Sequence, residues 1–445
     1  NGVVDIKGIR ASHDHQLVDI SGVASSSPKD SVYVRLEDFN LDYLFETLNI
    51  NYVAFGGNAS GEIVGSALFS KAPVARTNRL YVESLSYNGS VLGDGNISSH
   101  WDNAAKEITI NADIREKGRR TATVDGGIWV TRDSLSFDLN ANKVNIGFLK
   151  PFMSAFSSDI KGRASGQLKL YGTFSDIDLV GKAFADSIAM KVDYTNVYYS
   201  GSDSVYIHPG RIEVPGFTLH DRYGNTARLT GEVKHRYFHD PTFTFRVTNA
   251  QHLLCYDTDA KINPDWYGRI FGSGGGVIRG LPGLVAIDID MTTTRNSTFT
   301  FVLSDMQAVD DYPFLTFSDK RKEAQMRADT LGAKVDFVSL FKKKIEEQAS
   351  RPSVFKLGIR ATVTPQAQLN IIMDPVGGDK ITAYGSGAMQ IDYDSESDNM
   401  LMYGRYVCDE GTYNFTLQDL ILKDFTIQPG STISFNGDPL NADLN

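Results

Sequence analysis

The sequence predicts an all-β chain whose strands are mainly antiparallel, and three observations indicate it. Polar and apolar residues alternate over runs of six to eight positions, which is typical of strands with one buried and one wet face. The 445 residues include 40 glycines but only 14 prolines, a balance that suits many turns and bulges. Helical periodicity is scarce. Because parallel α/β sheets give continuous apolar runs instead, a doubly wound fold or a TIM barrel is not expected.

The alternating runs place large apolar side chains on one face of each predicted strand. In residues 134–140, for example, three apolar residues alternate with serine, aspartate and asparagine. Alternation alone does not distinguish an open apolar face from the closed core of a β-sandwich. The residues that we expect on such a face are Leu135, Phe137, Phe243, Phe245, Val247, Ile287, Ile289, Phe299, Phe301, Leu303, Met389 and Ile391.

Two short segments have the periodicity of an amphipathic helix. Residues 38–48 carry an apolar stripe, and Asn40 stands in a position to cap the helix N-terminus. Residues 147–156 repeat the pattern, with Pro151 in the first turn. The sequence therefore predicts short helices between the strands.

A third helical pattern, at residues 335–348, follows a charged stretch, and together they form an insertion at residues 319–350. Its apolar stripe includes Phe337, Phe341 and Ile345. This stripe predicts a lid over the sheet or a helix that docks on a partner. The alternative is a solvated linker followed by a helix packed on a sheet edge.

A loose internal repeat is also present. Gly61, Gly166, Gly276 and Gly387 each follow a cluster of small residues and begin an alternating strand, with spacings of 105, 110 and 111 residues. A recurring module of this length indicates an array or one long sheet rather than one compact core.

The charge balance excludes several classes of partner. The formal net charge is −10 and the isoelectric point is about 5.3, so binding to nucleic acid or to an anionic membrane through a basic face is not expected. No apolar run approaches the ~18 residues that a membrane-spanning helix needs. The only cysteines, Cys255 and Cys408, exclude a disulfide scaffold and a CxxC zinc site, and leave open whether the two pair with each other.

No arrangement of residues completes a catalytic or metal site. His13 and His15 share one side of a strand but have no third ligand nearby. His235 and His239 have HxxxH spacing but lack the glutamate of a zinc protease motif. We therefore expect a protein without enzymatic activity, catalytic residues, bound metal or cofactor.

The C-terminal residues carry the most specific motifs. Met402–Phe415 contains Gly-Thr-Tyr-Asn-Phe, and residues 425–439 read Phe-x-Ile-x-x-Gly-Ser-x-Ile-x-Phe-x-Gly-Asp-Pro. This order resembles the C-terminal region of the TamB-like translocation and assembly module proteins, within the AsmA-like group. Asp221–His235 resembles a mid-chain repeat of the same family. The sequence departs from the family pattern at Asn441 and Ala442, where the family commonly has Asn-Pro.

The resemblance implies an elongated antiparallel sheet curled into an open U-shaped trough, also called a β-taco, that is polar outside and apolar inside. Residues 1–318 would form trough repeats, residues 319–350 the helical insertion, and residues 351–445 a C-terminal trough region that stops before the family's final strands. The apolar residues named above would line a lipid groove, together with Phe415, Phe425 and Phe435.

The resemblance also implies a function and a location. The expected role is a conduit for phospholipid between the inner and outer membranes of a Gram-negative bacterium, in contact with acyl chains. The expected partner is an outer-membrane β-barrel assembly protein of the TamA or BamA type, which assembles outer-membrane proteins. The full protein would cross the periplasm from an N-terminal inner-membrane anchor that this chain does not contain. A rival interpretation is an extracellular or periplasmic β-sandwich or solenoid that binds glycans or acts as an adhesin.

Overall fold

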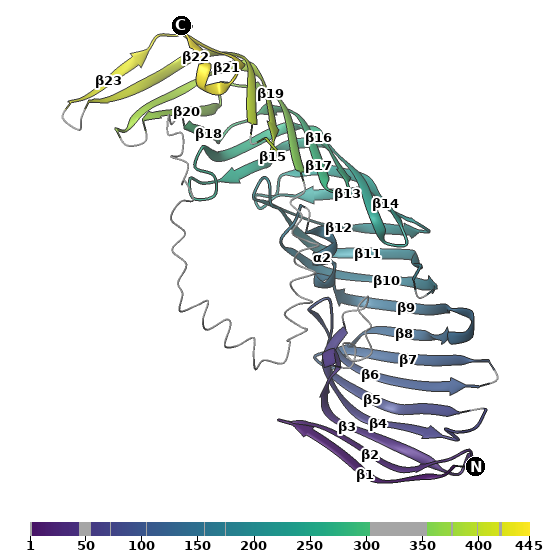
Figure 1. Cartoon of the computed structure of the whole chain (residues 1–445). Coiled ribbons are helices and arrows are strands. Elements are labelled where there is room, and N and C mark those ends of the chain that lie inside the picture. Colours follow the sequence, from purple (N-terminus) through teal and green to yellow (C-terminus); the bar gives the residue numbers. More distant parts are fainter. Residues whose placement is uncertain are drawn as a thin grey trace.

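The computed structural model describes residues 2–43, 55–71, 73–103, 105–154, 156–173, 175–302, 354–374, 377–397, 399–417 and 421–445. Within these residues, 25 strands belong to one continuous sheet. The strands stack along an arch from the N-terminus at one end to the C-terminus at the other (Figure 1). This confirms the predicted all-β fold and the long trough. Leu303 and the predicted insertion at residues 319–350, with Phe337, Phe341 and Ile345, lie outside the described residues.

The first seventeen strands form one meander, because each pairs antiparallel with the next along the chain. Antiparallel neighbours can be joined by short turns, so successive strands of this part of the sheet can pair without crossover connections. The strands are β1 (Val4–His13), β2 (Gln16–Ala24), β3 (Ser31–Asn40), β4 (Phe55–Ser66), β5 (Val74–Tyr87), β6 (Ser90–Asp102), β7 (Glu107–Glu116), β8 (Arg119–Trp129), β9 (Ser134–Asn145), β10 (Ile160–Gly172), β11 (Ile177–Val192), β12 (Val197–His208), β13 (Arg211–His220), β14 (Thr226–Arg236), β15 (His239–Thr258), β16 (Trp266–Leu281) and β17 (Leu284–Thr293).

The C-terminal strands continue the same sheet. β19 and β20 both pair with β21, and β21 pairs with β22, which in turn pairs with β23 and β24. The final short strand, β25, pairs with β24. These strands are β18 (Ser297–Val302), β19 (Val354–Val363), β20 (Ala367–Asp374), β21 (Asp379–Asp394), β22 (Asn399–Leu417), β23 (Ile421–Ile427), β24 (Thr432–Gly437) and β25 (Asp443–Leu444).

Two pairings in the described sheet are parallel, which the sequence pattern does not predict. β17 pairs with β19, and β18 pairs with β20, each in parallel register. Strands in parallel register need a crossover connection, because the chain must return to the start of its neighbour. Val302 and Val354, which pairs beside Leu284, are separated along the sheet by about 16 residues of strand, or roughly 50 Å. Residues 303–353, which make this connection, lie outside the described residues.

Short helical segments interrupt the meander where the sequence predicts them. The 3-10 helix η2 (Gly147–Leu149) leads into α2 (Lys150–Met153), which has Pro151 in its first turn. Residues 41–43 are helical, and Asn40 Oδ1 accepts a hydrogen bond from the Asp42 amide at 2.8 Å. The rest of the predicted helix at 38–48 lies outside the described residues. Two further 3-10 turns are η1 (Val130–Arg132) and η3 (Pro439–Asn441).

Candidate functional site: an apolar groove along the sheet

A single row of directly paired residues runs across eighteen strands of the sheet and contains only apolar residues and glycines. We call the face that carries it the inner face. The row begins on β1 and ends on β19, so it follows most of the arch (Figure 1). In order, its members are Ala11, Val18, Leu36, Gly61, Leu80, Ile97, Ala112, Val124, Leu139, Leu168, Gly181, Ile207, Ile212, Val233, Phe243, Gly280, Val285 and Phe355.

Glycines in this face give room to the aromatic rings beside them. A Cβ added to Gly280 would lie 2.0 Å from a ring carbon of its cross-strand partner Phe243. A Cβ added to Gly126 would lie 2.1 Å from the Ser136 carbonyl oxygen and 2.8 Å from the Phe137 ring. The abundance of glycine in the sequence therefore serves the close packing of rings on the inner face as well as the turns.

On each strand, the residue beside a member of the apolar row points to the opposite, outer face. These neighbours form a second row of paired residues, which is largely polar. This second row runs from β6 to β21 and, apart from one tyrosine and one alanine, consists of polar and charged residues. The paired residues are Asn96, Asp113, Thr123, Asn140, Gln167, Lys182, Tyr206, Glu213, Glu232, Thr244, Arg279, Ala286, Lys356 and Asp394. The sheet is thus apolar on one side and wet on the other along its length.

The pairing register brings the predicted lining residues onto the inner face. Val247 and Ile289 both pair with Gly276, and Ile289 continues through Ile359 to Ile391. Met389 continues through Gly404 to Phe435. The others follow by direct pairing or by strand alternation: Leu135, Phe137, Phe243, Phe245, Ile287, Phe299, Phe301, Phe415 and Phe425.

These residues differ in how much of them water reaches. Phe301, Met389 and Phe435 are buried, and the last two belong to a packed cluster with Tyr406 and Ile371 near the C-terminus. Phe425, on β23, is 42% exposed. The inner face at the C-terminal end therefore includes a packed core, and only part of it is accessible.

The inner face is more open in the middle of the N-terminal half. Ile97, Ala112, Val124, Leu139 and Leu168, on β6 to β10, are all half-buried. An apolar row that is neither buried nor fully exposed is what one wall of an open groove provides. We call this row of five half-buried residues, which crosses β6 to β10, the open stretch.

Connections between strands cover parts of the inner face next to the open stretch. Leu41, in the helical turn after β3, packs with Ala59, Val82, Leu85 and Ile114 in one buried cluster. The rings of Phe55 and Tyr87 lie 5.1 Å apart, and Tyr87 is also 5.8 Å from Phe148 of η2. Leu41 and Phe148, from the described parts of two predicted helices, thus pack on the inner face, a placement that sequence periodicity does not reveal.

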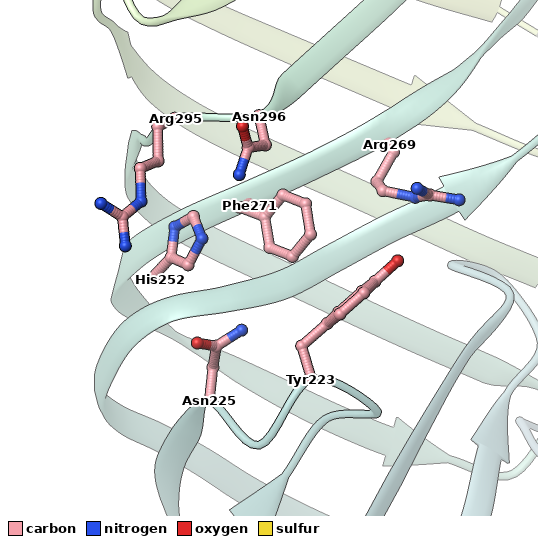
Figure 2. Close-up of a pocket in the computed structure, with 7 residues that line it drawn as sticks. All are labelled: Tyr223, Asn225, His252, Arg269, Phe271, Arg295 and Asn296. Carbon is pink, nitrogen blue, oxygen red and sulfur yellow. The ribbon is translucent and has the colours of Figure 1, made fainter.

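On the outer side, the turn between β13 and β14 is built around one buried carboxylate. Asp221 is 5% exposed and accepts hydrogen bonds from the amides of Tyr223, Asn225 and Leu254 at 2.8–3.0 Å. The Asn225 side chain adds a fourth at 2.9 Å. This turn is the Asp-Arg-Tyr-Gly-Asn motif singled out in the sequence, and it borders a pocket of about 400 Å³ (Figure 2).

A second cover of the inner face lies between β10–β12 and β15–β19. We call residues 156–159 and 193–196 the inner-face bridge. The ring of Phe156 lies 5.3 Å from that of Phe243, and the ring of Tyr194 stacks on that of Phe355 at 3.8 Å. Two connections from one part of the sheet therefore reach members of the apolar row in another part.

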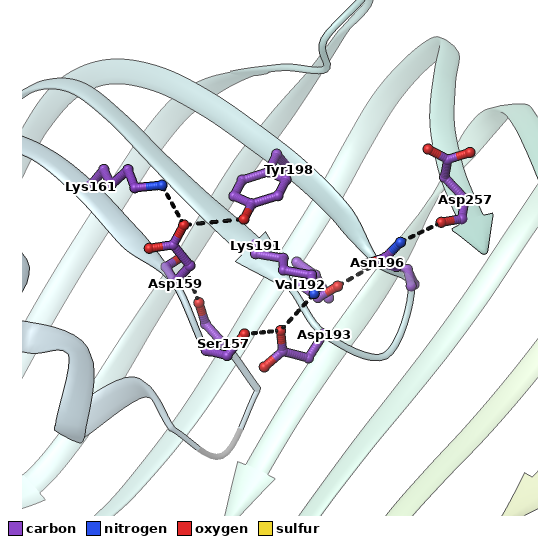
Figure 3. Close-up of polar contacts among 11 residues, drawn as sticks. Ser157, Asp159, Lys161, Lys191, Val192, Asp193, Asn196, Tyr198 and Asp257 are labelled. Atoms are coloured by element: carbon purple, nitrogen blue, oxygen red, sulfur yellow. Dashed lines mark hydrogen bonds and ion pairs between the residues drawn. The ribbon is translucent and has the colours of Figure 1, made fainter. Parts of the chain in front are cut away.

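Polar contacts fix the two halves of the inner-face bridge to each other (Figure 3). The Asp193 amide donates to the Phe156 carbonyl at 3.1 Å, and Ser158 Oγ donates to Asp193 Oδ1 at 2.6 Å. Asp159 Oδ2 accepts from Lys161 Nζ at 2.6 Å, which together with further hydrogen bonding holds the pKa of Asp159 below its ordinary value.

The bridge is also tied to β15. Asn196 Nδ2 donates to the Asp257 carbonyl at 2.7 Å, and the Asp257 amide donates to the Thr195 carbonyl at 3.0 Å (Figure 3). The β13–β14 hairpin lies between β12 and β15 in the pairing order, so this contact joins strands that are not neighbours. The bridge is thus a braced element rather than a loose loop.

The described residues show no cluster of three or more His, Cys, Asp or Glu side chains that could hold a metal ion. Cys255 and Cys408 are free thiols. Burial raises the pKa of Cys255 to about 12, which makes it a poor nucleophile near neutral pH. In the described part of the chain, no helix is long and apolar enough to cross a bilayer.

Comparison with protein families matches residues 216–445 to the TamB C-terminal domain. Comparisons with curated proteins and with solved structures give no match. TamB proteins belong to the translocation and assembly module and span the periplasm. The match covers more than half of the chain and includes the motifs at 221–235 and 402–439. Together with the long sheet that is apolar on one face, it establishes that the chain belongs to the TamB family.

Proposed function

We propose that the inner face of this sheet is a conduit for phospholipid acyl chains, and that the protein is a carrier without enzymatic activity. The uninterrupted apolar row from Ala11 to Phe355 supports this proposal most directly. Acyl chains need a continuous apolar surface and no specific polar site, and the row supplies such a surface strand after strand.

The dimensions support the same proposal. Eighteen strands at ~4.8 Å spacing give a path of roughly 80 Å, whereas one bilayer leaflet holds acyl chains about 15 Å long. The whole row is longer than several acyl chains laid end to end, and the open stretch alone, which crosses five strands or about 20 Å, is long enough for one. Burying half of a ~16-carbon chain is worth about 6 kcal/mol, at roughly 0.8 kcal/mol per CH₂. That is enough to hold a lipid without preventing its movement.

The family membership supports the setting. We propose that the full protein works in the periplasm of a Gram-negative bacterium and passes phospholipid between the inner and outer membranes. Its partner is an outer-membrane β-barrel protein of the assembly type, with which it takes part in assembling outer-membrane proteins. The charged residues of the outer face keep the sheet solvated along the way.

The test compares two adjacent residues on opposite faces. Leu139→Asp places a charge in the open stretch, and Asn140→Asp places the same charge on the outer face. The full-length protein is purified in each form, its phospholipid is measured by mass spectrometry, and its melting temperature is recorded. We expect Leu139→Asp to lose bound phospholipid and to melt within a few degrees of the wild type, because Leu139 is half-buried.

Two outcomes would contradict the conduit. If Leu139→Asp keeps its lipid, the inner face does not hold acyl chains. If it unfolds while Asn140→Asp does not, Leu139 belongs to a closed core.

A further inference from the structure

The pocket beside the Asp221 turn is separate from the groove, because it lies on the outer face. Its floor is Phe271 of β16, which is 4% exposed. The next residue, Gly272, faces inward, since a Cβ added there would lie 2.5 Å from Met291 and 3.4 Å from Cys255. Neighbouring residues of a strand point to opposite faces, so Phe271 and the pocket above it face away from the groove.

Two connections and a bulge within one strand supply the walls of the pocket (Figure 2). Tyr223 and Asn225 come from the turn after β13, and His252 comes from a bulge within β15. Arg295 and Asn296 come from the turn between β17 and β18. The rings are fixed: His252 stacks on Phe271 at 4.7 Å, and Tyr223 meets Phe271 edge-on at 5.4 Å.

The charges around this pocket favour an anion. Arg222 and Arg269 both bond Asp257, at 2.6 and 3.0 Å, so one carboxylate faces two guanidinium groups. Arg295 is exposed and has no ion-pair partner among the described residues. The other nearby carboxylate, Asp221, is already engaged by four hydrogen bonds within its turn. A protein with a formal net charge of −10 thus has a locally cationic pocket.

The remaining groups suit a ring that carries hydroxyl groups. The Asn225 and Asn296 amides can donate and accept hydrogen bonds. His252 Nδ1 is bonded to Thr294 Oγ1 at 2.7 Å, which fixes the ring and leaves Nε2 for a ligand. Tyr223 is 52% exposed at the margin, where its ring offers an apolar face. A volume of about 400 Å³ accommodates one sugar-sized ring with an anionic group.

We propose that this pocket binds a phosphorylated saccharide, with the phosphate on Arg295 and Arg269 and the sugar ring against Tyr223. Arginine presents paired N–H donors that match phosphate oxygens. The same phosphate chemistry occurs in free sugar phosphates and in lipid headgroups, so the test separates these sources.

The test is calorimetric titration of the purified protein with glucose 1-phosphate, inorganic phosphate, glucose and phosphatidylglycerol vesicles. We expect saturable binding of glucose 1-phosphate, weaker binding of inorganic phosphate and none of glucose. Arg295→Ala should weaken glucose 1-phosphate binding by about 10- to 100-fold, the effect of losing a hydrogen bond to a charged group. Because Arg295 is exposed and unpaired in the described structure, its removal should leave the melting temperature unchanged.

Two further variants make the result specific. Tyr223→Ala should weaken the binding of glucose 1-phosphate and leave the binding of inorganic phosphate unchanged. Arg360→Ala removes an exposed arginine of β19 that does not line the pocket, and it should change neither. Lack of binding by both phosphate ligands, or equal binding in wild type and Arg295→Ala, would overturn the proposal. Binding of the vesicles but not of glucose 1-phosphate would assign the pocket to a lipid headgroup and would refute a saccharide site.

Discussion

The ring of Tyr194 lies flat on the ring of Phe355, with centroids 3.8 Å apart and planes only 4° from parallel, although the two residues are far apart in the sequence. Tyr194 belongs to the inner-face bridge, and Phe355 ends the apolar row on β19. This contact joins two parts of the sheet that backbone pairing does not connect directly. It thereby helps to set how tightly the trough curls between β12 and β19.

The first prediction is that Tyr194 and Phe355 stabilise the fold as a pair. Phe355→Ala should lower the free energy of unfolding by about 3–5 kcal/mol because the ring is buried, and Tyr194→Ala by about 2 kcal/mol because its ring is only half-buried. The double variant should cost less than the sum, by about 0.5–1.5 kcal/mol for an aromatic pair. Urea unfolding of the four proteins gives the cycle, and strict additivity would show that the two rings are not coupled.

The second prediction concerns the buried carboxylate of Asp221. All four of its described partners donate hydrogen bonds, so Asp221→Asn would turn an N–H group toward at least one donor. We expect a loss of about 2 kcal/mol, the cost of a buried hydrogen bond to a charged group. Thermal melting measures it. An unchanged melting temperature would mean that the turn does not depend on this carboxylate.

The third prediction concerns Tyr406, which is 2% exposed and whose hydroxyl has no hydrogen-bond partner among the described residues. Burial raises the pKa of this hydroxyl, so it stays protonated. Tyr406→Phe should leave stability unchanged or raise it by up to about 1 kcal/mol, because it removes an unsatisfied polar group. Tyr406→Ala should cost about 3–5 kcal/mol through the cavity that it leaves. A clear loss in Tyr406→Phe would reveal a partner for the hydroxyl.

The fourth prediction concerns pH. Arg163 bonds both carboxylate oxygens of Glu116, at 2.6 and 3.1 Å, and this lowers the pKa of Glu116. The ion pair therefore adds stability above the unfolded-state pKa of ~4.3, and loses it as the pH falls through the lower folded-state pKa. Both side chains are more than a third exposed, so the effect is at most about 1 kcal/mol. The difference in melting temperature between wild type and Glu116→Gln should be present at pH 7 and vanish below the folded-state pKa. A difference that persists there would contradict the ion-pair explanation.

The inner face was predictable because strand alternation is local. Leu135 and Phe243 each stand between two polar residues, and Ile287 and Met389 each stand between an alanine and a polar residue. A meander then brings such residues onto one face. The register itself depends on bulges, such as the one at Ser84 with its positive φ, which alternation does not specify.

The connections that pack on the inner face could not be predicted in the same way. Phe156 and Tyr194 lie in connections, and their contacts with Phe243 and Phe355 depend on how the whole sheet curls. The outer pocket likewise joins residues of two connections with residues of β15 and β16, and only the Asp221 turn carries a recognisable motif. Contacts of this kind arise from tertiary packing, so no period in the sequence reports them.

Leu168 and Lys169 offer a direct test of whether the open stretch of the inner face carries acyl chains. They are adjacent on β10 and lie on opposite faces, with Leu168 in the apolar row and Lys169 exposed. A photo-crosslinking amino acid is placed at each position of the full-length protein in cells, and the products are analysed for covalently attached phospholipid. Lipid adducts at Leu168 and none at Lys169 are the expected result. Equal adducts at both positions, or none at Leu168, would contradict a lipid conduit on the inner face.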